Sequence, residues 1–278
     1  MKLGLFGINT MGTADAASMV KVAQACEAAG FDSVWTGEHV VLPDPQVPPS
    51  PEAPEQAMLD PAVALAWVGA HTSTLKLGTG IIILPQRNPL VLAKEMASLD
   101  YLSGGRLLLG VGVGYLEPEF RALGIPMEDR GTRTEEYIGA MRAIWSGDSY
   151  SGTYVAFDGV KANPRPLAAR DLPVIMAGHT AAAYRRAMTT AQGWYGFGLN
   201  VESAKACLAG LTKAADRYER PGWLGPLEIS VTPRSRLDDD SVADYEAMGV
   251  HRLIPLSGGA DAEGVVAMVD DLAKRYVH

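Results

Sequence analysis

Hydrophobic positions along the chain form two kinds of segment that alternate from one end to the other. Short runs rich in β-branched and aromatic residues predict strands, and longer stretches with apolar residues at helical spacing predict helices. The predicted strands are 2–8, 33–36, 75–84, 106–113, 173–176, 194–197, 227–231 and 250–256. The predicted helices are 14–29, 61–73, 90–102, 133–146, 181–191, 202–218, 240–247 and 262–275, and a hairpin is expected across 153–163.

Strands that alternate with helices pair in parallel through right-handed crossovers, and eight such units predict a closed (β/α)8 TIM barrel. The length of 278 residues suits one barrel domain over 1–278, with a small insertion near 150–165. An open doubly wound sheet is the alternative. The usual dinucleotide fingerprint, G-x-G-x-x-G at the start of a helix, is absent, because Gly110–Gly114 reads G-x-G-x-G and continues into Tyr115–Pro118.

Two long connections interrupt this alternation on the same face of the predicted barrel. The segment 40–59 follows the second strand and contains six prolines, which excludes a helix or a central strand. The segment 114–132 follows the fourth strand. A long loop at this face is often a lid over an active site, and a disordered insertion is the other interpretation of 40–59.

The composition of the chain indicates which classes of partner to expect. The net charge is −8, and lysine and arginine form no cluster, so we expect no nucleic-acid partner. No apolar run approaches 18 residues and the start of the chain lacks a signal peptide's apolar region, so we expect no membrane partner and a cytoplasmic location. The cysteines, Cys26 and Cys207, are expected to be buried thiols. We expect a homodimer that acts on a small-molecule substrate.

One long segment carries a resemblance to a known family. Leu77–Gly114 reads LGTGIIILPQRNPLVLAKEMASLDYLSGGRLLLGVGVG and closely resembles the third and fourth βα units of luciferase-like flavin oxidoreductases. Ala29–His39, the segment YLEPEFRALGIPMEDRGTRTEEYI and Pro173–Tyr195 are similar to further units of the same family. The segments after the second and fourth strands look most like the actinobacterial branch that uses the deazaflavin coenzyme F420. Flavin mononucleotide (FMN) is the alternative cofactor.

The resemblance implies a cofactor-binding role for the third and fourth strands. Members of the family place a bulge, often with a non-proline cis peptide, at the position of Gly80 and Ile81, behind the cofactor ring. Gly112 and Gly114 in the glycine-rich fourth strand are interpreted as allowing close backbone approach to a ligand. The alternative for each of these glycines is tight packing against a neighbouring element.

A phosphate site is expected after the fifth strand. Gly178 permits an unusual backbone angle, Thr180 can cap the following helix, and a helix N-terminus with free N–H groups suits a phosphate. The resemblance places the cofactor phosphate at Gly178, His179 and Thr180, although an ordinary capped helix has the same pattern. General barrel rules point instead to the loops after the last strands, here Ser257–Gly259, which we keep as the alternative phosphate or substrate site.

His39 is the candidate catalytic residue. It is expected to end the second strand at the barrel mouth, and it matches the active-site histidine position of the family. Because adjacent strand residues point in opposite directions, Glu38 is expected to tether backbone or loop 40–59 instead. Sugar-oxidising deazaflavin members carry an acidic residue where this chain has Tyr115, and Glu117 and Glu119 are expected to be out of register.

These observations favour hydride transfer between F420 and a small organic substrate. An FMN-dependent luciferase-like monooxygenase is the second hypothesis, because cofactor identity decides between hydride transfer and oxygen activation. A non-catalytic flavin- or deazaflavin-binding protein is the third. No metal site is predicted, since the five histidines form no His-x-His pair, and no strand offers a lysine near its C-terminal end for a Schiff base.

Overall fold

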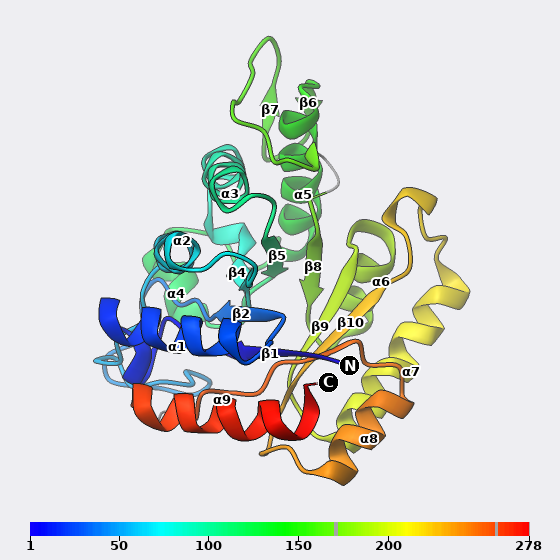
Figure 1. The fold of residues 1–278 in the computed structure, drawn as a ribbon. Helices are drawn as coiled ribbons and strands as arrows, with labels where there is room; N and C mark the ends of the chain where they lie inside the picture. The colour runs from blue at the N-terminus through cyan, green and yellow to red at the C-terminus, as the bar shows by residue number, and fades with distance from the viewer. Residues whose placement is uncertain (170–171, 259–260, 278) are drawn as a thin grey trace.

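The computed structural model describes residues 1–169, 172–258 and 261–277. The parallel strands follow one another in the order β3-β2-β1-β11-β10-β9-β8-β5-β4, and β3 also pairs with β5, which closes the sheet (Figure 1). The strands are β1 Lys2–Phe6, β2 Ser33–Thr36, β3 Lys76–Thr79, β4 Ile82–Ile83, β5 Leu107–Gly112, β8 Val174–Ala177, β9 Gly193–Leu199, β10 Glu228–Pro233 and β11 Arg252–Leu253. Because β3 and β4 are two halves of one barrel strand, the predicted eight-stranded TIM barrel is confirmed.

Helices follow the strands as the sequence predicted. They are α1 Ala16–Ala28, α2 Pro61–His71, α3 Pro89–Ser103, α4 Glu117–Ala122, α5 Arg130–Ser146, α6 Ala181–Thr190, α7 Val201–Arg217, α8 Asp239–Ala247 and α9 Ala262–Tyr276. Two of them begin with the same local signal, a capping side chain followed by proline. Asp60 accepts hydrogen bonds from two first-turn N–H groups of α2, and Asn88 does the same for α3.

Several boundaries differ from the sequence prediction. The third strand, expected to run unbroken over 75–84, is interrupted, because the Gly80 N–H bonds to the Thr36 carbonyl at 2.7 Å and the chain bulges there. The last strand is much shorter than 250–256. The expected hairpin lies earlier, with β6 Tyr150–Ser151 antiparallel to β7 Ala156–Phe157.

The connection 114–132 contains the short helix α4, which the sequence analysis missed. The connection 40–59 forms neither helix nor strand, apart from an isolated bridge between Met58 and Thr10. Its end is fixed by Asn9, whose side-chain amide donates to the Leu59 carbonyl at 2.6 Å. No helix within the described part of the chain is long and apolar enough to cross a membrane.

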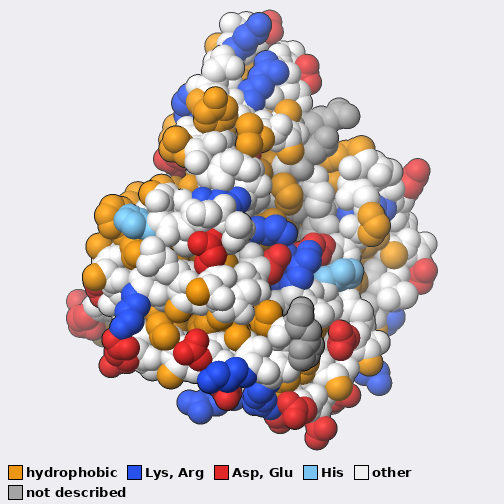
Figure 2. Space-filling model, in the orientation of Figure 1, with side chains coloured by type: hydrophobic (Ala, Val, Ile, Leu, Met, Phe, Trp, Pro, Cys, Tyr) orange, Lys and Arg blue, Asp and Glu red, His pale blue; other side chains and the backbone are white. Residues whose placement is uncertain are grey.

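A network of ion pairs lies at the amino end of the barrel. Arg252 is fully buried, and its guanidinium donates to Asp32 at 2.8 Å and to Glu228. Lys76 and Lys2 complete the network at 3.2 Å and 3.1 Å from these carboxylates. Burial raises the pKa of Asp32 and of Glu228, but Arg252 and the lysines outweigh it, and the net direction for both is downward. Figure 2 shows side chains of both charges gathered near the two chain ends, which lie close together in Figure 1.

Apolar side chains fill the barrel above this network. Trp35, Leu108, Ile175, Tyr195 and Ile254 form a buried cluster inside the barrel. The next layer toward the carboxyl ends is only partly buried and consists of Phe6, Ile81 and Ala177. The barrel is therefore a packed core whose upper layer is open to a ligand, rather than a pore.

Candidate active site at the barrel mouth

The predicted site residues come from neighbouring strands. The pairs β2–β3, β4–β5 and β5–β8 are parallel, so their carboxyl ends lie at the same mouth. His39 follows β2, Gly80 and Ile81 join β3 to β4, Gly112 ends β5, and Gly178 follows β8. His39 therefore does not end the strand as predicted, because β2 stops three residues earlier, at Thr36.

The bulge in the third barrel strand has the expected conformation. The Gly80–Ile81 peptide bond is cis. A side chain at Gly80 would lie 3.1 Å from both the Phe6 ring and the Thr36 carbonyl oxygen. The Ile81 side chain packs on the buried cluster from above. This arrangement leaves a small apolar platform at the mouth.

The glycines at and after the fourth barrel strand pack closely against neighbouring elements. A side chain at Gly112 would come within 2.8 Å of Ile81, and one at Gly110 within 1.9 Å of the Thr79 carbonyl oxygen. Gly114 has a φ of 77°, and a side chain there would collide with Ile83 and Phe120. Close approach to the bulged strand thus accounts for these three positions without a ligand.

The segment after β8 leads into a capped helix. Gly178 has a φ of 129°, a conformation that L side chains rarely adopt, and its carbonyl accepts a hydrogen bond from the Trp194 indole at 2.9 Å. The Thr180 hydroxyl accepts from the Ala183 N–H at 3.2 Å. His179 is exposed, and its ring centroid lies 6.3 Å from that of Trp194. The helix start is therefore well ordered and open to solvent.

His39 is held by a carboxylate that the sequence analysis placed out of register. The His39 Nδ1 atom lies 3.1 Å from Oε2 of Glu119, whose side chain is fully buried. The other oxygen of Glu119 accepts the Val40 N–H at 2.6 Å. One buried carboxylate thus fixes both the imidazole and the backbone where loop 40–59 begins.

A short sequence pattern could have indicated that Glu119 is buried. Leu116-Glu117-Pro118 has the proline in the first helical turn that marks a helix start, and a helix beginning there turns Glu119 inward. A charged residue that is 1% exposed needs a partner, and His39 supplies it. The acidic group sought directly after the fourth strand therefore lies four residues past Tyr115.

Tyr115 stands on the other side of the imidazole. Its hydroxyl lies 3.4 Å from His39 Nε2, and the two rings meet edge to face with centroids 5.8 Å apart. Partial burial raises the pKa of Tyr115, and the charges of Glu119 and Glu52 raise it further, so the phenol stays protonated at neutral pH. Tyr115 is about half exposed. The order from protein to solvent is Glu119, His39, Tyr115.

Glu38 has the tethering role predicted for it. Its buried carboxylate accepts the Ile83 N–H of β4 and a hydrogen bond from Arg87. Arg87 also donates to Asp60 at 2.8 Å. Burial raises the pKa of Glu38, and the nearby Arg87 only partly opposes this. Glu38 therefore fastens the end of β2 to the bulged strand and leaves His39 to face the mouth.

The alternative phosphate site after the last strand is only partly visible. Ser257 is 7% exposed, and its backbone N–H bonds to the Phe6 carbonyl at 3.0 Å. Gly258 has a φ of 74°. Gly259 lies outside the described residues.

The fold and this mouth define a class of protein, and sequence comparison agrees. The profile of the luciferase-like monooxygenase family matches residues 1–260, so the chain belongs to this family of flavin- and deazaflavin-dependent oxidoreductases and monooxygenases. An uncharacterized protein of Mycobacterium tuberculosis is 29% identical over 266 residues, which is 91% of each chain.

Solved structures with the same fold carry both kinds of cofactor. An F420-dependent secondary alcohol dehydrogenase in complex with an F420–acetone adduct matches with a TM-score of 0.78 and 14% identity, over 98% of this chain and 97% of that one. The oxygenating constituent of 3,6-diketocamphane monooxygenase from Pseudomonas putida, in complex with FMN, matches with a TM-score of 0.62 and 18% identity, over 84% and 67%.

Proposed function

We propose that this protein transfers a hydride between coenzyme F420 and a small organic substrate at the barrel mouth. The observation that carries the proposal is the juxtaposition, at one mouth, of an apolar platform formed by Phe6, Ile81 and Ala177 with a buried His39–Glu119 pair. The platform suits a flat ring, and the pair suits proton transfer. The likeness of 114–132 to the deazaflavin branch favours F420 over FMN.

The residues present fit such a cofactor. Phe6, Ile81 and Ala177 offer a partly buried apolar surface against which a planar ring can pack. At the start of α6, the side-chain cap of Thr180 satisfies the Ala183 N–H, so the N–H groups of Ala181 and Ala182 can donate to a phosphate. Gly178 keeps the approach to this helix end free of a side chain.

F420, when bound, supplies or accepts the hydride, and the chain's own residues manage the proton. The Glu119 carboxylate accepts from Nδ1, which fixes the ring orientation and assigns the neutral imidazole its Nδ1–H tautomer. Nε2 then faces Tyr115 and the mouth. In its protonated form, His39 donates from Nε2, directly or through the Tyr115 hydroxyl, to the substrate atom on which negative charge develops.

The second candidate is an FMN-dependent monooxygenase. It is favoured by the FMN-bound monooxygenase that shares the fold. The same mouth residues would then orient a flavin, and the reaction would consume oxygen. A non-catalytic cofactor-binding protein is the third candidate, and turnover of any substrate rules it out.

The cofactor preference gives the direct test of the proposed function. We expect F420 to bind more tightly than FMN in equilibrium fluorescence titrations of each cofactor under identical conditions. Each titration is repeated with the Ile81→Asp variant, which places a charge on the platform and should weaken binding of either cofactor. A clear preference for FMN would defeat the F420 assignment and favour the monooxygenase.

The phosphate position makes a second prediction. Thr180→Val removes the hydroxyl and is expected to weaken cofactor binding at least about tenfold, the value of one hydrogen bond to an anion, whereas Thr180→Ser keeps binding near wild type. Because Thr180 also caps α6, Asn200→Ala, which removes the cap of α7, is the matched control for loss of a cap alone. Equal affinity in Thr180→Val and wild type would move the phosphate toward Ser257.

The expected homodimer is retained as part of the proposal. It is supported by exposed apolar side chains on two helices that pack side by side, Val63 and Trp67 on α2 and Val91 and Leu102 on α3. Burying such side chains against a second copy removes apolar surface from water.

A further inference from the structure

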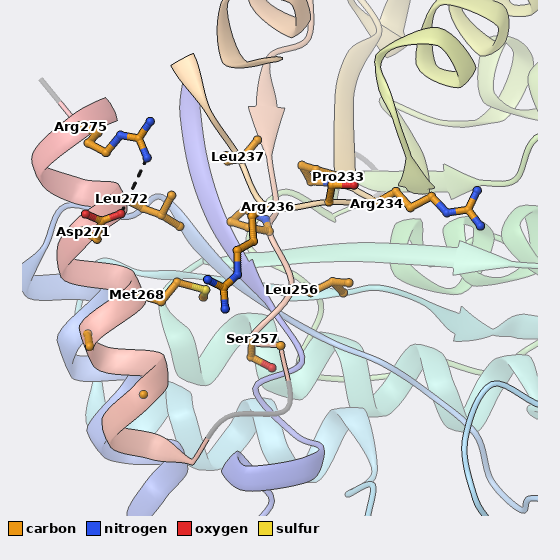
Figure 3. A pocket seen from close by; sticks show the side chains of 15 residues that line it. Pro233, Arg234, Arg236, Leu237, Leu256, Ser257, Met268, Asp271, Leu272 and Arg275 are labelled. Atoms are coloured by element: carbon orange, nitrogen blue, oxygen red, sulfur yellow. Dashed lines mark ion pairs between the residues drawn. The ribbon is translucent and has the colours of Figure 1, made fainter. Parts of the chain in front are cut away.

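A cavity of about 650 Å³ lies away from His39 and the start of α6, between the segment that follows β10 and one face of α9, and it includes Ser257 of the alternative phosphate site (Figure 3). Arg236 and Ser257 form its polar part. Its side walls are the apolar side chains of Leu237, Leu256, Met268 and Leu272. The cavity is separated from the start of α6 by β9, because β9 stands between β8 and β10 in the barrel.

The guanidinium of Arg236 forms no ion pair with any residue that the structure describes. Figure 3 shows its guanidinium extending into the cavity toward Met268 and Ser257. Among the residues that the structure describes, Arg236 has no hydrogen bond or ion pair. The acidic residue on the cavity wall, Asp271, lies 3.9 Å from Arg275 at the far end. In a chain of net charge −8, an unpaired guanidinium in a cavity favours an anion.

Ser257 is a second unpartnered group at the same end. The residue is more than nine-tenths buried, it lines the cavity, and its hydroxyl has no hydrogen-bond partner in the described part of the chain. The bond from its backbone N–H to the Phe6 carbonyl holds the residue at the edge of the cavity. The hydroxyl is therefore available to donate a hydrogen bond, and an anion in the cavity would accept it.

The apolar side walls of the cavity indicate that the rest of the ligand is hydrocarbon. Leu237 and Leu272 are buried, and Met268 is partly buried with a flexible, polarizable side chain that adapts to different apolar shapes. From these contacts we infer that the cavity binds a small amphipathic organic acid. Arg236 and Ser257 hold its carboxylate or phosphate head group, and Leu237, Met268 and Leu272 hold its hydrocarbon part. Recognition of this kind is independent of the cofactor at the mouth.

The test uses hexanoate as the amphipathic acid, with inorganic phosphate and hexanol as probes of the head group and of the hydrocarbon. Isothermal titration of the full chain is expected to show saturable binding of hexanoate, no comparable binding of hexanol, and competition by phosphate. Arg236→Met is expected to weaken hexanoate binding at least about tenfold, and Ser257→Ala about threefold or more. Arg217→Met removes the same charge from the exposed face of α7 and should bind like wild type.

Three outcomes would overturn the inference. They are no saturable binding of hexanoate or phosphate, binding of hexanol as tight as that of hexanoate, and equal weakening by Arg236→Met and Arg217→Met. Circular dichroism checks that the variants fold, which is expected because Arg236 is exposed. Repeating the titration with F420 present separates this site from the proposed function. Unchanged affinity supports an independent site, whereas displacement by F420 would place the cavity in the cofactor site.

Discussion

Replacing His39 with glutamine should lower kcat by about a hundredfold or more while leaving the cofactor dissociation constant nearly unchanged. Glutamine keeps a polar group of similar reach but cannot carry the proton that hydride transfer to an unsaturated or carbonyl carbon requires. The side chain of His39 is 8% exposed, so little solvent reaches the ring to replace it. The effect therefore belongs to the chemical step and not to binding.

Steady-state kinetics and cofactor titration of the same preparation measure the two quantities separately. His71→Gln, at the half-buried C-terminal end of α2, is the control for loss of a histidine elsewhere. Loss of cofactor affinity with normal turnover at saturation would make His39 a binding residue. Glu119→Gln is the companion variant. Nitrogen-15 NMR of the imidazole should show the Nδ1–H tautomer in the wild type and its partial loss in the variant, because an amide can donate to Nδ1 as well as accept from it.

Replacing Arg252 with methionine should lower the free energy of unfolding by about 3 kcal/mol, the lower end of the cost of removing one partner from a buried ion pair. The lower end applies because the carboxylates left behind, Asp32 and Glu228, are 18% and 33% exposed and keep Lys76 and Lys2. Such a loss is a large fraction of the stability of an ordinary domain. The midpoint and slope of urea unfolding measure it.

The dependence of this loss on pH identifies its cause. The pKa values of Asp32 and Glu228 are lowered in the folded state, so their stabilisation is present above their unfolded pKa values and is lost as the pH falls through the folded ones. Wild type should therefore lose stability steeply below about pH 4, and Arg252→Met less steeply. Lys21→Met, which breaks an exposed pair with Glu263, should change little. Parallel pH curves for wild type and Arg252→Met would show that Arg252 acts by packing alone.

The barrel could be predicted from local sequence, and the position of its bulge from the family resemblance. The helix starts at Asp60-Pro61 and Asn88-Pro89 are each specified by two adjacent residues, a capping side chain and a proline. Strand periodicity is likewise a property of short runs. The resemblance added Gly80 and Ile81, where the chain has its cis bulge. The placement of His39 at the mouth also followed, because parallel strands direct all their carboxyl ends to one face.

The sequence by itself therefore determined the alternation of elements, their closure into a barrel and the family. The tertiary structure alone decided which side chains meet. His39 and Glu119 are 80 positions apart, and Arg252 and Asp32 are 220 positions apart, so nothing local could pair them. Glu119 was misplaced because counting along an extended chain cannot anticipate the short helix that turns it inward. Periodicity records that a residue is buried, but barrel closure and helix packing decide what it is buried against.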